Sequence, residues 1–453
     1  MVEHNNDVSL MHVAESLLTQ ARRGEQIEIY AARGIDTEVA VFDGEVESFS
    51  SARSHGAGIR VITGGRLGFA YAASLDPGEL NAVLARAREN AVFVEPDDAV
   101  GLAEPDGVVP VDMELYAAGW HEVTDEQRVA LALRVEHATK SRHPKVTATL
   151  GCSYDDSIVE TVVASTTGVR GQTQRSRCSL VAQAVARDGD DTQTGYGYSV
   201  GRHFDELDAQ HVATDAAVRA TRLLGAKQPH SAVVTAVFEP RMTSAFLSLI
   251  ASGFSAEAVR KGRSLFVGRE GEQLAPSEFT LVEDPTDARA YGASRIDSEG
   301  LATRVVSLID KGVLVGLLHN STTARRVGVA STASATRGGY SGRVGVGARA
   351  LALSAGPSSA AEVVASIDRG VLVTSMMGLH SGVNPVSGDF SVGIEGLLIT
   401  DGELGQPIRE ATMASSLLRM LSNVTAIGAD LEWLPANAAG QTLAVADVTM
   451  SGR

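Results

Sequence analysis

The chain has 453 residues, a formal net charge of −16 and 44% hydrophobic residues. This length predicts two or three domains, and the composition is that of a globular protein with large cores, which excludes intrinsic disorder. The negative charge repels phosphate backbones, and no cluster of Lys and Arg offsets it locally. We therefore expect no nucleic acid partner.

The same composition bears on the cellular compartment. No apolar stretch approaches the roughly 20 residues of a membrane helix, and residues 1–7 are polar and acidic, unlike a signal sequence. We expect a cytoplasmic protein that does not contact a membrane. Cys152 and Cys178 have neither the number for a disulfide framework nor a zinc-binding spacing, so both are predicted to be buried free thiols.

The first half of the chain predicts an antiparallel sheet with flanking helices. An apolar stripe over 10–21 predicts a helix that Gly24 caps. Strands are predicted over 27–32, 38–42, 46–51, 58–63 and 67–73. The dipeptides Asp43-Gly44 and Gly64-Gly65 fit two-residue hairpin turns, in which both residues need positive φ.

Capping signals place the next helices. Asp76 followed by Pro77 predicts the start of a second helix, and Thr124 with Gln127 resembles a capping box that starts a third. Between them, 95–113 contains three prolines and is predicted to be a long surface connection. Strands follow between 146 and 203, and a small-residue stripe predicts a helix over 209–224.

A domain boundary is expected near 227–229. The second half begins with a predicted strand over 232–238 and a helix over 241–252, and then becomes largely β with many glycines. The fold class is therefore α+β: residues 1–228 form an N-terminal domain with an antiparallel sheet and flanking helices, and residues 229–453 a mostly β, barrel-like domain.

One glycine-rich segment near the C-terminus predicts a site built from backbone. Gly388-Asp389-Phe390-Ser391 lies among five glycines within nineteen residues and precedes a predicted strand. Its simplest interpretation is a tight hairpin connection. Its functional interpretation is a backbone edge that pairs with an extended peptide while Phe390 packs beneath it.

The order of segments and several motifs resemble the TldD/PmbA family, and more closely its PmbA-like (TldE) branch. The resemblance covers nearly the whole chain and implies the two-domain arrangement. The motifs that carry it are Gly65-Arg66-Leu67-Gly68-Phe69-Ala70-Tyr71, Asp297-Ser298-Glu299-Gly300, Gly370-Val371-Leu372-Val373-Thr374-Ser375-Met376-Met377-Gly378, Gly388-Asp389-Phe390-Ser391 and Val448-Thr449-Met450-Ser451-Gly452.

The resemblance also shows what this chain lacks. Members of the TldD branch resemble zinc peptidases, with a helical His-Glu-x-x-x-His early in the second domain and a cysteine near the C-terminus. The corresponding stretches here, 237–247 and 434–441, contain no histidine and no cysteine. A zinc site of that type cannot assemble from this chain alone. We therefore expect no catalytic residue, no metal ligand and no cofactor in this chain, and zinc in a partner subunit.

Several other polar residues have a structural interpretation as well as a functional one. Glu239 is the carboxylate left in the first of these stretches and is expected to be a capping or surface residue. His121, His203 and His211 lack the spacing of a metal site. Asp297 and Glu299 are either turn residues that bind nearby amides or substrate-binding residues, and the two interpretations are about equal. The glycine-rich stretch 338–347 lacks a Walker lysine and is expected to be a flexible loop near the substrate channel.

The candidate substrate-binding residues are therefore Asp297, Glu299, Gly388, Asp389, Phe390 and Ser391. The resemblance implies the metal-free subunit of a heteromeric TldD/TldE-type peptidase that degrades or processes small or unfolded peptides. Its partners would be a TldD-like subunit with His-Glu-x-x-x-His and a peptide, and a homodimer of the isolated chain stays open. The alternative is a self-associating, protein-binding regulator without peptidase activity. Hydrolysis by this chain's own carboxylates also stays open, because fold does not fix chemistry.

Overall fold

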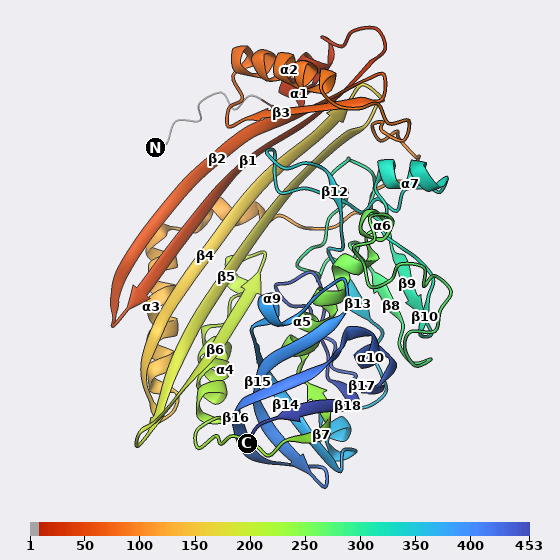
Figure 1. Cartoon of the computed structure of the whole chain (residues 1–453). Coiled ribbons are helices and arrows are strands. Elements are labelled where there is room, and N and C mark those ends of the chain that lie inside the picture. Colours follow the sequence, from red (N-terminus) through yellow and green to blue (C-terminus); the bar gives the residue numbers. More distant parts are fainter. Residues whose placement is uncertain (1–8) are drawn as a thin grey trace.

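The computed structural model describes residues 9–453, so the polar residues 1–8 lie outside the described part (Figure 1). The first half is built on a six-stranded antiparallel sheet with the order β3-β2-β1-β4-β5-β6. Its strands are β1 (Glu25–Phe42), β2 (Glu45–Thr63), β3 (Arg66–Ala72), β4 (Val146–Ser165), β5 (Arg170–Asp188) and β6 (Asp191–Gly201).

Strands β1 and β2 are each one long strand, so the prediction of four short strands in this region was wrong. Residues 33–37 and 52–57 continue the strands: Gly34 pairs with Ser54 on one side and with Val159 of β4 on the other. Because β1 has a hydrogen-bonding partner on both edges, its backbone stays extended even where its side chains are polar. Residues 45–55 of β2 are exposed on both faces of the sheet, and Arg33 of β1 forms an ion pair with Glu160 of β4.

Four helices cover the opposite face of the sheet, and the C-terminal half lies on the inner side of its curve (Figure 1). The helices are α1 (Leu10–Leu18), α2 (Pro77–Val92), α3 (Asp125–Ser141) and α4 (Ala209–Thr221). Close packing requires glycine in the strands beneath them. A Cβ on Gly68 of β3 would lie 1.8 Å from the Ala87 carbonyl oxygen of α2, so no other residue fits there without moving the helix.

Most of the predicted turns and caps are confirmed. Asp43 and Gly44 both have positive φ (52° and 84°), and so do Gly64 and Gly65 (55° and 72°). The Asp76 side chain accepts a hydrogen bond of 3.0 Å from the Glu79 amide, and Thr124 forms the predicted capping box with Gln127. Helix α1 ends at Leu18, three residues before the end of its apolar stripe. Cys152 and Cys178 are buried free thiols.

The second half contains a closed five-stranded β-barrel. The strands β16-β15-β14-β7-β18 are neighbours in this order, and β16 also pairs with β18, which closes the ring. Their bounds are β7 (Ala232–Phe238), β14 (Arg369–Met377), β15 (Asp389–Thr400), β16 (Glu403–Ser416) and β18 (Leu443–Ser451). The α+β fold class with a barrel-like second half is therefore confirmed. The domain boundary at 228 stays a prediction.

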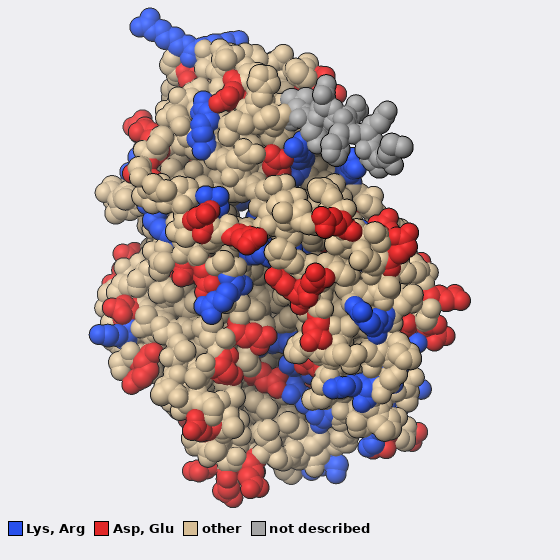
Figure 2. All heavy atoms as spheres, turned by 180° about the vertical axis from the view of Figure 1, so that it is seen from behind, with Lys and Arg blue, Asp and Glu red and all other residues tan. Residues whose placement is uncertain are grey.

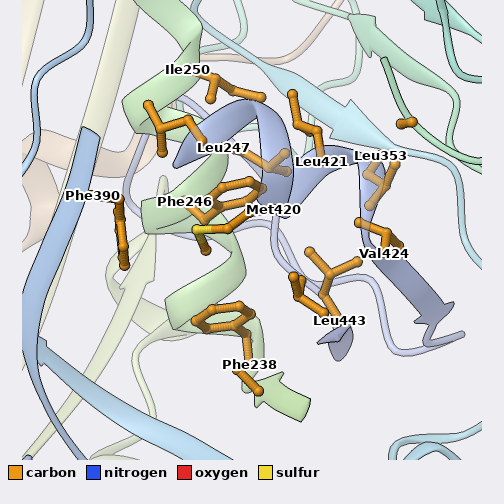
Figure 3. Packing of buried hydrophobic residues seen from close by; sticks show 14 of the residues in the cluster. Phe238, Phe246, Leu247, Ile250, Leu353, Phe390, Met420, Leu421, Val424 and Leu443 are labelled. Atoms are coloured by element: carbon orange, nitrogen blue, oxygen red, sulfur yellow. The ribbon is translucent and has the colours of Figure 1, made fainter. Parts of the chain in front are cut away.

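Helix α5 (Pro240–Ala251) provides one side of the main core of this half (Figure 3). Phe246, Leu247 and Ile250 are completely buried, as is Phe238 at the end of β7. Across from them lie Phe390 at the start of β15 and Met420 of α10. The predicted helix over 241–252 is thus confirmed to within one residue, since its amphipathic stripe meets an apolar surface along its whole length.

The remaining elements are short. A second, four-stranded sheet has the order β10-β9-β8-β13, and β11 pairs with β12. No helix in the described range 9–453 is long and apolar enough to cross a membrane. The bounds are α6 (Ala256–Arg260), β8 (Leu281–Glu283), β9 (Val306–Asp310), β10 (Val313–Leu314), α7 (Ser321–Val327), β11 (Ala335–Thr336), β12 (Gly345–Val346), β13 (Leu351–Leu353), α8 (Ala360–Ala365), α9 (Leu379–Gly382), α10 (Leu417–Ser422) and β17 (Val424–Ile427).

We predict that Phe390→Ala destabilises the protein by about 3–5 kcal/mol, because it removes a buried ring and leaves a cavity in the barrel core. Asp389→Ala is the matched control, since the neighbouring side chain is exposed and binds only the Ser387 hydroxyl. We expect this control to cost less than about 1 kcal/mol. Urea unfolding of both variants measures the difference, and equal costs would contradict the packing described here.

Candidate functional site

A cavity of about 860 Å³ lies between the inner face of the sheet and the second half of the chain. Strands β1, β4 and β5 form one wall, and the loops around 291–298, 336–349 and 435–437 form the other. Because strand residues alternate between faces, every second residue of these strands reaches the cavity. The charged lining residues are Asp36, Glu38, Asp155, Asp156, Arg175, Arg177, Asp297, Arg337 and Arg349.

A buried ionic cluster next to this cavity joins the two halves of the chain. Arg60 of β2 donates to Glu28 of β1, with 2.8 Å between Nε and Oε1, and lies 3.3 Å from Glu299. Arg337 donates to Glu28 at 2.6 Å, across 309 positions of the sequence. Burial alone would raise the pKa of Glu28, but the two guanidinium groups outweigh it and hold the pKa at about 2. Glu28 is therefore ionised at neutral pH.

The Asp297-Ser298-Glu299-Gly300 motif forms a buried turn beside this cluster. Asp297 accepts hydrogen bonds from the Glu299, Leu301 and Ala335 amides at 2.9, 3.0 and 3.0 Å. Glu299 accepts from the Ser321 amide at 2.9 Å in addition to its contact with Arg60. Burial and the charge of Glu299 raise the pKa of Asp297 to about 6. The turn interpretation is therefore what the geometry supports, and Asp297 also lies in the cavity lining.

Several arginines gather on the other side of the cavity. Arg175 and Arg177 of β5 are two residues apart, so they share one face, and both donate to the Tyr291 carbonyl at 3.0 and 3.3 Å. The Arg177 guanidinium also lies 4.2 Å from the centre of the Tyr291 ring. Burial, followed by the charges of Arg177, Arg202 and Arg349, lowers the pKa of Arg175 to about 9. This part of the cavity therefore has a positive potential.

Acidic residues lie on the neighbouring strands. In the sheet register, Asp36 of β1 stands opposite Ser157 of β4, which stands opposite Arg177 of β5. One row further, Glu38 stands opposite Asp155. Burial and the charge of Glu38 raise the pKa of Asp155. The cavity thus has an acidic side on β1 and β4 and a basic side on β5.

The predicted site at Gly388–Ser391 lies elsewhere and does not line this cavity. Residues 389–391 pair with 414–416 of β16 on one edge. On the other edge, Val383 bridges Phe390, and the Asn384 amide donates to the Asp389 carbonyl at 2.9 Å. The chain itself occupies part of the edge that a peptide was expected to use. Phe390 packs beneath the strand as predicted, with 2% exposure.

The stretches 237–247 and 434–441 lie against each other. The Ser244 hydroxyl donates to the Ala438 carbonyl at 2.7 Å, and the Ser248 hydroxyl donates to the Asn437 side chain at 2.6 Å. A Cβ on Gly440 would lie 1.8 Å from the Pro240 carbonyl oxygen, so the contact is close. Small residues and hydroxyl groups therefore fill this junction.

Glu239, just before α5, is held by cations. It forms ion pairs with Arg222 at 2.6 Å and with Arg219 at 3.0 Å, and its side chain does not cap the helix. Arg241 pairs in turn with Asp215 of α4. Within residues 9–453, no three His, Cys, Asp or Glu side chains converge as a metal site requires. The charges around Glu239 are thus paired within the chain.

Three family models match the chain in sequence. They are PmbA/TldA metallopeptidase domain 1 over residues 27–91, the central domain over 119–224 and the C-terminal domain over 231–452. The chain belongs to the PmbA/TldD family. Because β1 pairs with β4, the first two family domains share one sheet here.

Curated relatives and solved structures agree with the PmbA/TldD assignment. The chain is 26% identical over 440 residues to a metalloprotease PmbA homolog of Haemophilus influenzae, covering 94% of each chain. It is 24% identical to metalloprotease PmbA of Escherichia coli O157:H7, covering 93% of this chain and 91% of that protein. The structure of TldE from Thermococcus kodakarensis matches with a TM-score of 0.88 at 22% identity, covering 97% of this chain and 100% of that one, which shows a common fold.

Sequence reasoning missed most of the charged residues of this candidate site. Glu28, Arg60 and Arg337 come from three distant segments, and nothing in their spacing indicates that they meet. The pair Arg175 and Arg177 did carry a signal, since alternate positions of a strand face the same way. Gly339, in the loop expected near a substrate channel, does line the cavity. Over the face in Figure 2, acidic and basic side chains are interspersed, with no continuous basic area among the described residues.

We predict that Glu28→Gln destabilises the protein by about 3 kcal/mol or more, because it leaves Arg60 and Arg337 buried without their counterion. Since the pKa of Glu28 is lowered to about 2, its contribution is fully present above the unfolded pKa of about 4.5 and is lost as the pH falls toward 2. The difference from the wild type should therefore be constant between pH 5 and 8 and shrink below about 4.5.

Urea unfolding across this pH range measures the effect. Glu15→Gln is the matched control, because the ion pair of Glu15 with Arg170 is largely exposed and should contribute less than about 1 kcal/mol. If Glu28→Gln costs no more than this control, the ionic cluster does not hold the two halves together.

Proposed function

We propose that this chain is the metal-free subunit of a heteromeric TldD/TldE-type peptidase that processes small or unfolded peptides. The observation that carries the proposal is the junction between α5 and residues 434–441. The resemblance to the family puts zinc ligands of the TldD branch in these two stretches. Here they meet through the Ser244 to Ala438 hydrogen bond and the close contact of Gly440 with Pro240.

The residues at this junction do not fit a zinc ion. Zinc in proteins takes thiolate, imidazole and carboxylate ligands. The buried Thr243 hydroxyl of α5 has no hydrogen-bond partner, but a hydroxyl is not among these ligands. Two carboxylates beside α5, those of Asp215 and Glu239, are engaged by Arg219, Arg222 and Arg241. Zinc, its bound water and the general base would therefore come from the partner subunit.

The role left to this chain is to hold the substrate and to complete the chamber. The cavity between the sheet and the loops of the second half has room for a short peptide, at about 860 Å³, and carries both acidic and basic side chains. A stable complex with a catalytic subunit would bury on the order of 2,000 Å² or more. This assignment accounts for a large, polar cavity in a chain whose α5 junction has no metal ligands.

The proposal predicts a defined complex. When the tagged chain is purified from its native host, we expect a stoichiometric partner that carries His-Glu-x-x-x-His, with about one zinc ion per pair, as a single catalytic site requires. Mass spectrometry identifies the partner, and elemental analysis gives the zinc content. Peptide hydrolysis should need both proteins together.

Two controls make the result decisive. The chain alone and the partner alone are assayed on the same unfolded peptide, and neither should reach the rate of the mixture. Recovery of only a zinc-free homo-oligomer would contradict the proposal and favour a self-associating binding protein. Hydrolysis by this chain alone at the rate of the mixture would contradict it as well.

A further inference from the structure

Among the described residues, Arg175, Arg177 and Arg349 of the cavity lining and the neighbouring Arg202 form no ion pair with a carboxylate. Among residues 9–453, no carboxylate oxygen lies within 4.0 Å of a side-chain nitrogen of Arg175, Arg177, Arg202 or Arg349. Arg175 and Arg177 donate to the Tyr291 carbonyl, Arg202 to the Ala288 and Ala290 carbonyls, and Arg349 to the Ala335 carbonyl. Carbonyl oxygens orient guanidinium groups but do not neutralise them.

This arrangement is costly for the protein on its own. Like charges that are partly removed from water repel one another, and burial disfavours each charged form. Two nearby carboxylates, those of Glu283 and Asp297, interact with the charge of Arg349 but form no ion pair with it. Glu283 accepts from the Arg349 and Ala350 amides at 2.7 and 3.1 Å, and Asp297 is held by three other amides. A bound anion would supply a compensating charge.

Hydrogen-bond donors without a partner also indicate an anionic ligand. The buried Nε of Arg175 has no hydrogen-bond partner, and neither do Nε and Nη1 of Arg337, which lines the same cavity. The Arg337 side chain is completely buried. Buried polar groups are nearly always paired in native proteins, so donors left over at a cavity wall indicate a ligand that supplies acceptors. A planar carboxylate fits best, since guanidinium groups bind it with two parallel hydrogen bonds.

The opposite side of the cavity decides what kind of anion fits. Asp36 stands in one row of the sheet with Arg177, two strands away, and Glu38 with Asp155 lies one row further. Two strand spacings are about 10 Å. Carboxylates at that distance repel a polyanion such as a polyphosphate, but they attract a cation. A short peptide in zwitterionic form has both charges, and about three extended residues span about 10 Å.

We propose that Arg175, Arg177 and Arg349 bind the terminal carboxylate of a short peptide, whose amino end is directed toward Asp36, Glu38 and Asp155. The proposal rests on the proposed function only in taking a peptide as the ligand. It adds that the chain selects peptides with a free carboxyl end. No covalent step is involved, and the three arginines act by binding and orienting the ligand.

Calorimetric titration of the isolated chain with trialanine and with trialanine amide tests this assignment. We expect the free acid to bind at least about tenfold more tightly than the amide, since charge-assisted bidentate pairs are lost on amidation. Arg175→Gln and Arg349→Gln should abolish the preference. Arg175→Lys keeps the positive charge but loses the planar guanidinium that forms two parallel hydrogen bonds. This variant should therefore retain only part of the preference for the free acid. Arg260→Gln, in an exposed arginine at the end of α6, is the matched control and should bind like the wild type.

Thermal unfolding separates loss of binding from loss of folding. Because Arg175 is surrounded by like charges, Arg175→Gln should not lower the melting temperature of the free protein. A variant that keeps its stability and loses the preference for the free acid supports a binding role. Equal binding of acid and amide, or no binding of either, would overturn the proposal.

Two further outcomes would also overturn it. If inorganic phosphate displaces trialanine at a lower concentration than trialanine itself requires, the arginines form a general anion site. If Arg175→Gln weakens association with a catalytic subunit but leaves peptide binding unchanged, the arginines serve the interface. These titrations use the chain alone and therefore test peptide binding independently of the partner complex. If they fail while the complex forms, only the binding proposal is wrong. If they succeed while no complex forms, only the proposed function is wrong.

Discussion

The buried ionic cluster of Glu28, Arg60, Glu299 and Arg337 is the contact on which the arrangement of the two halves depends. Glu28 and Arg60 belong to the sheet, whereas Glu299 and Arg337 come from loops of the second half. A buried charge without its partner is strongly unfavourable. The loops around 297 and 337 therefore have one arrangement against the sheet, and the cavity beside them keeps its shape.

The polar inner face of the sheet follows from the same arrangement. Helices α1 to α4 bury the apolar residues of the other face, so the inner face is free to carry charged and small residues. The long strands set acidic residues on β1 and β4 and arginines on β5 at fixed distances, because backbone pairing holds the register. The charge separation across the cavity is thus a property of the sheet, and no flexible loop is needed to maintain it.

The barrel and the α5 junction form the packed part of the second half. The barrel closes through the pairing of β16 with β18, and α5 packs Phe246, Leu247 and Ile250 into the core. Elsewhere on α5, the Ser244 hydroxyl donates to the Ala438 carbonyl, and Pro240 lies close to Gly440. The fold is therefore that of the PmbA/TldD family, and small residues and hydroxyl groups fill this junction.

Local signals in the sequence were sufficient for caps, turns and amphipathic helices. Asp76, Thr124 and the Asp43-Gly44 turn act through neighbours within a few residues, so the sequence by itself determined them. The apolar stripe of α5 and the α+β class were determined in the same way. Residues 33–37 and 52–57 were not, since their extended conformation depends on backbone pairing with strands far away in sequence.

The contacts within the candidate site could not be predicted from the sequence. The motif residues Asp297 and Glu299 were identified, but only the structure places Glu299 against Arg60 and Asp297 in the cavity wall. Arg175, Arg337 and Arg349 come together because the sheet curves around the second half of the chain. The sequence determined which local elements form. The tertiary structure alone decided which charges meet, because charges act through space and their strength depends on burial.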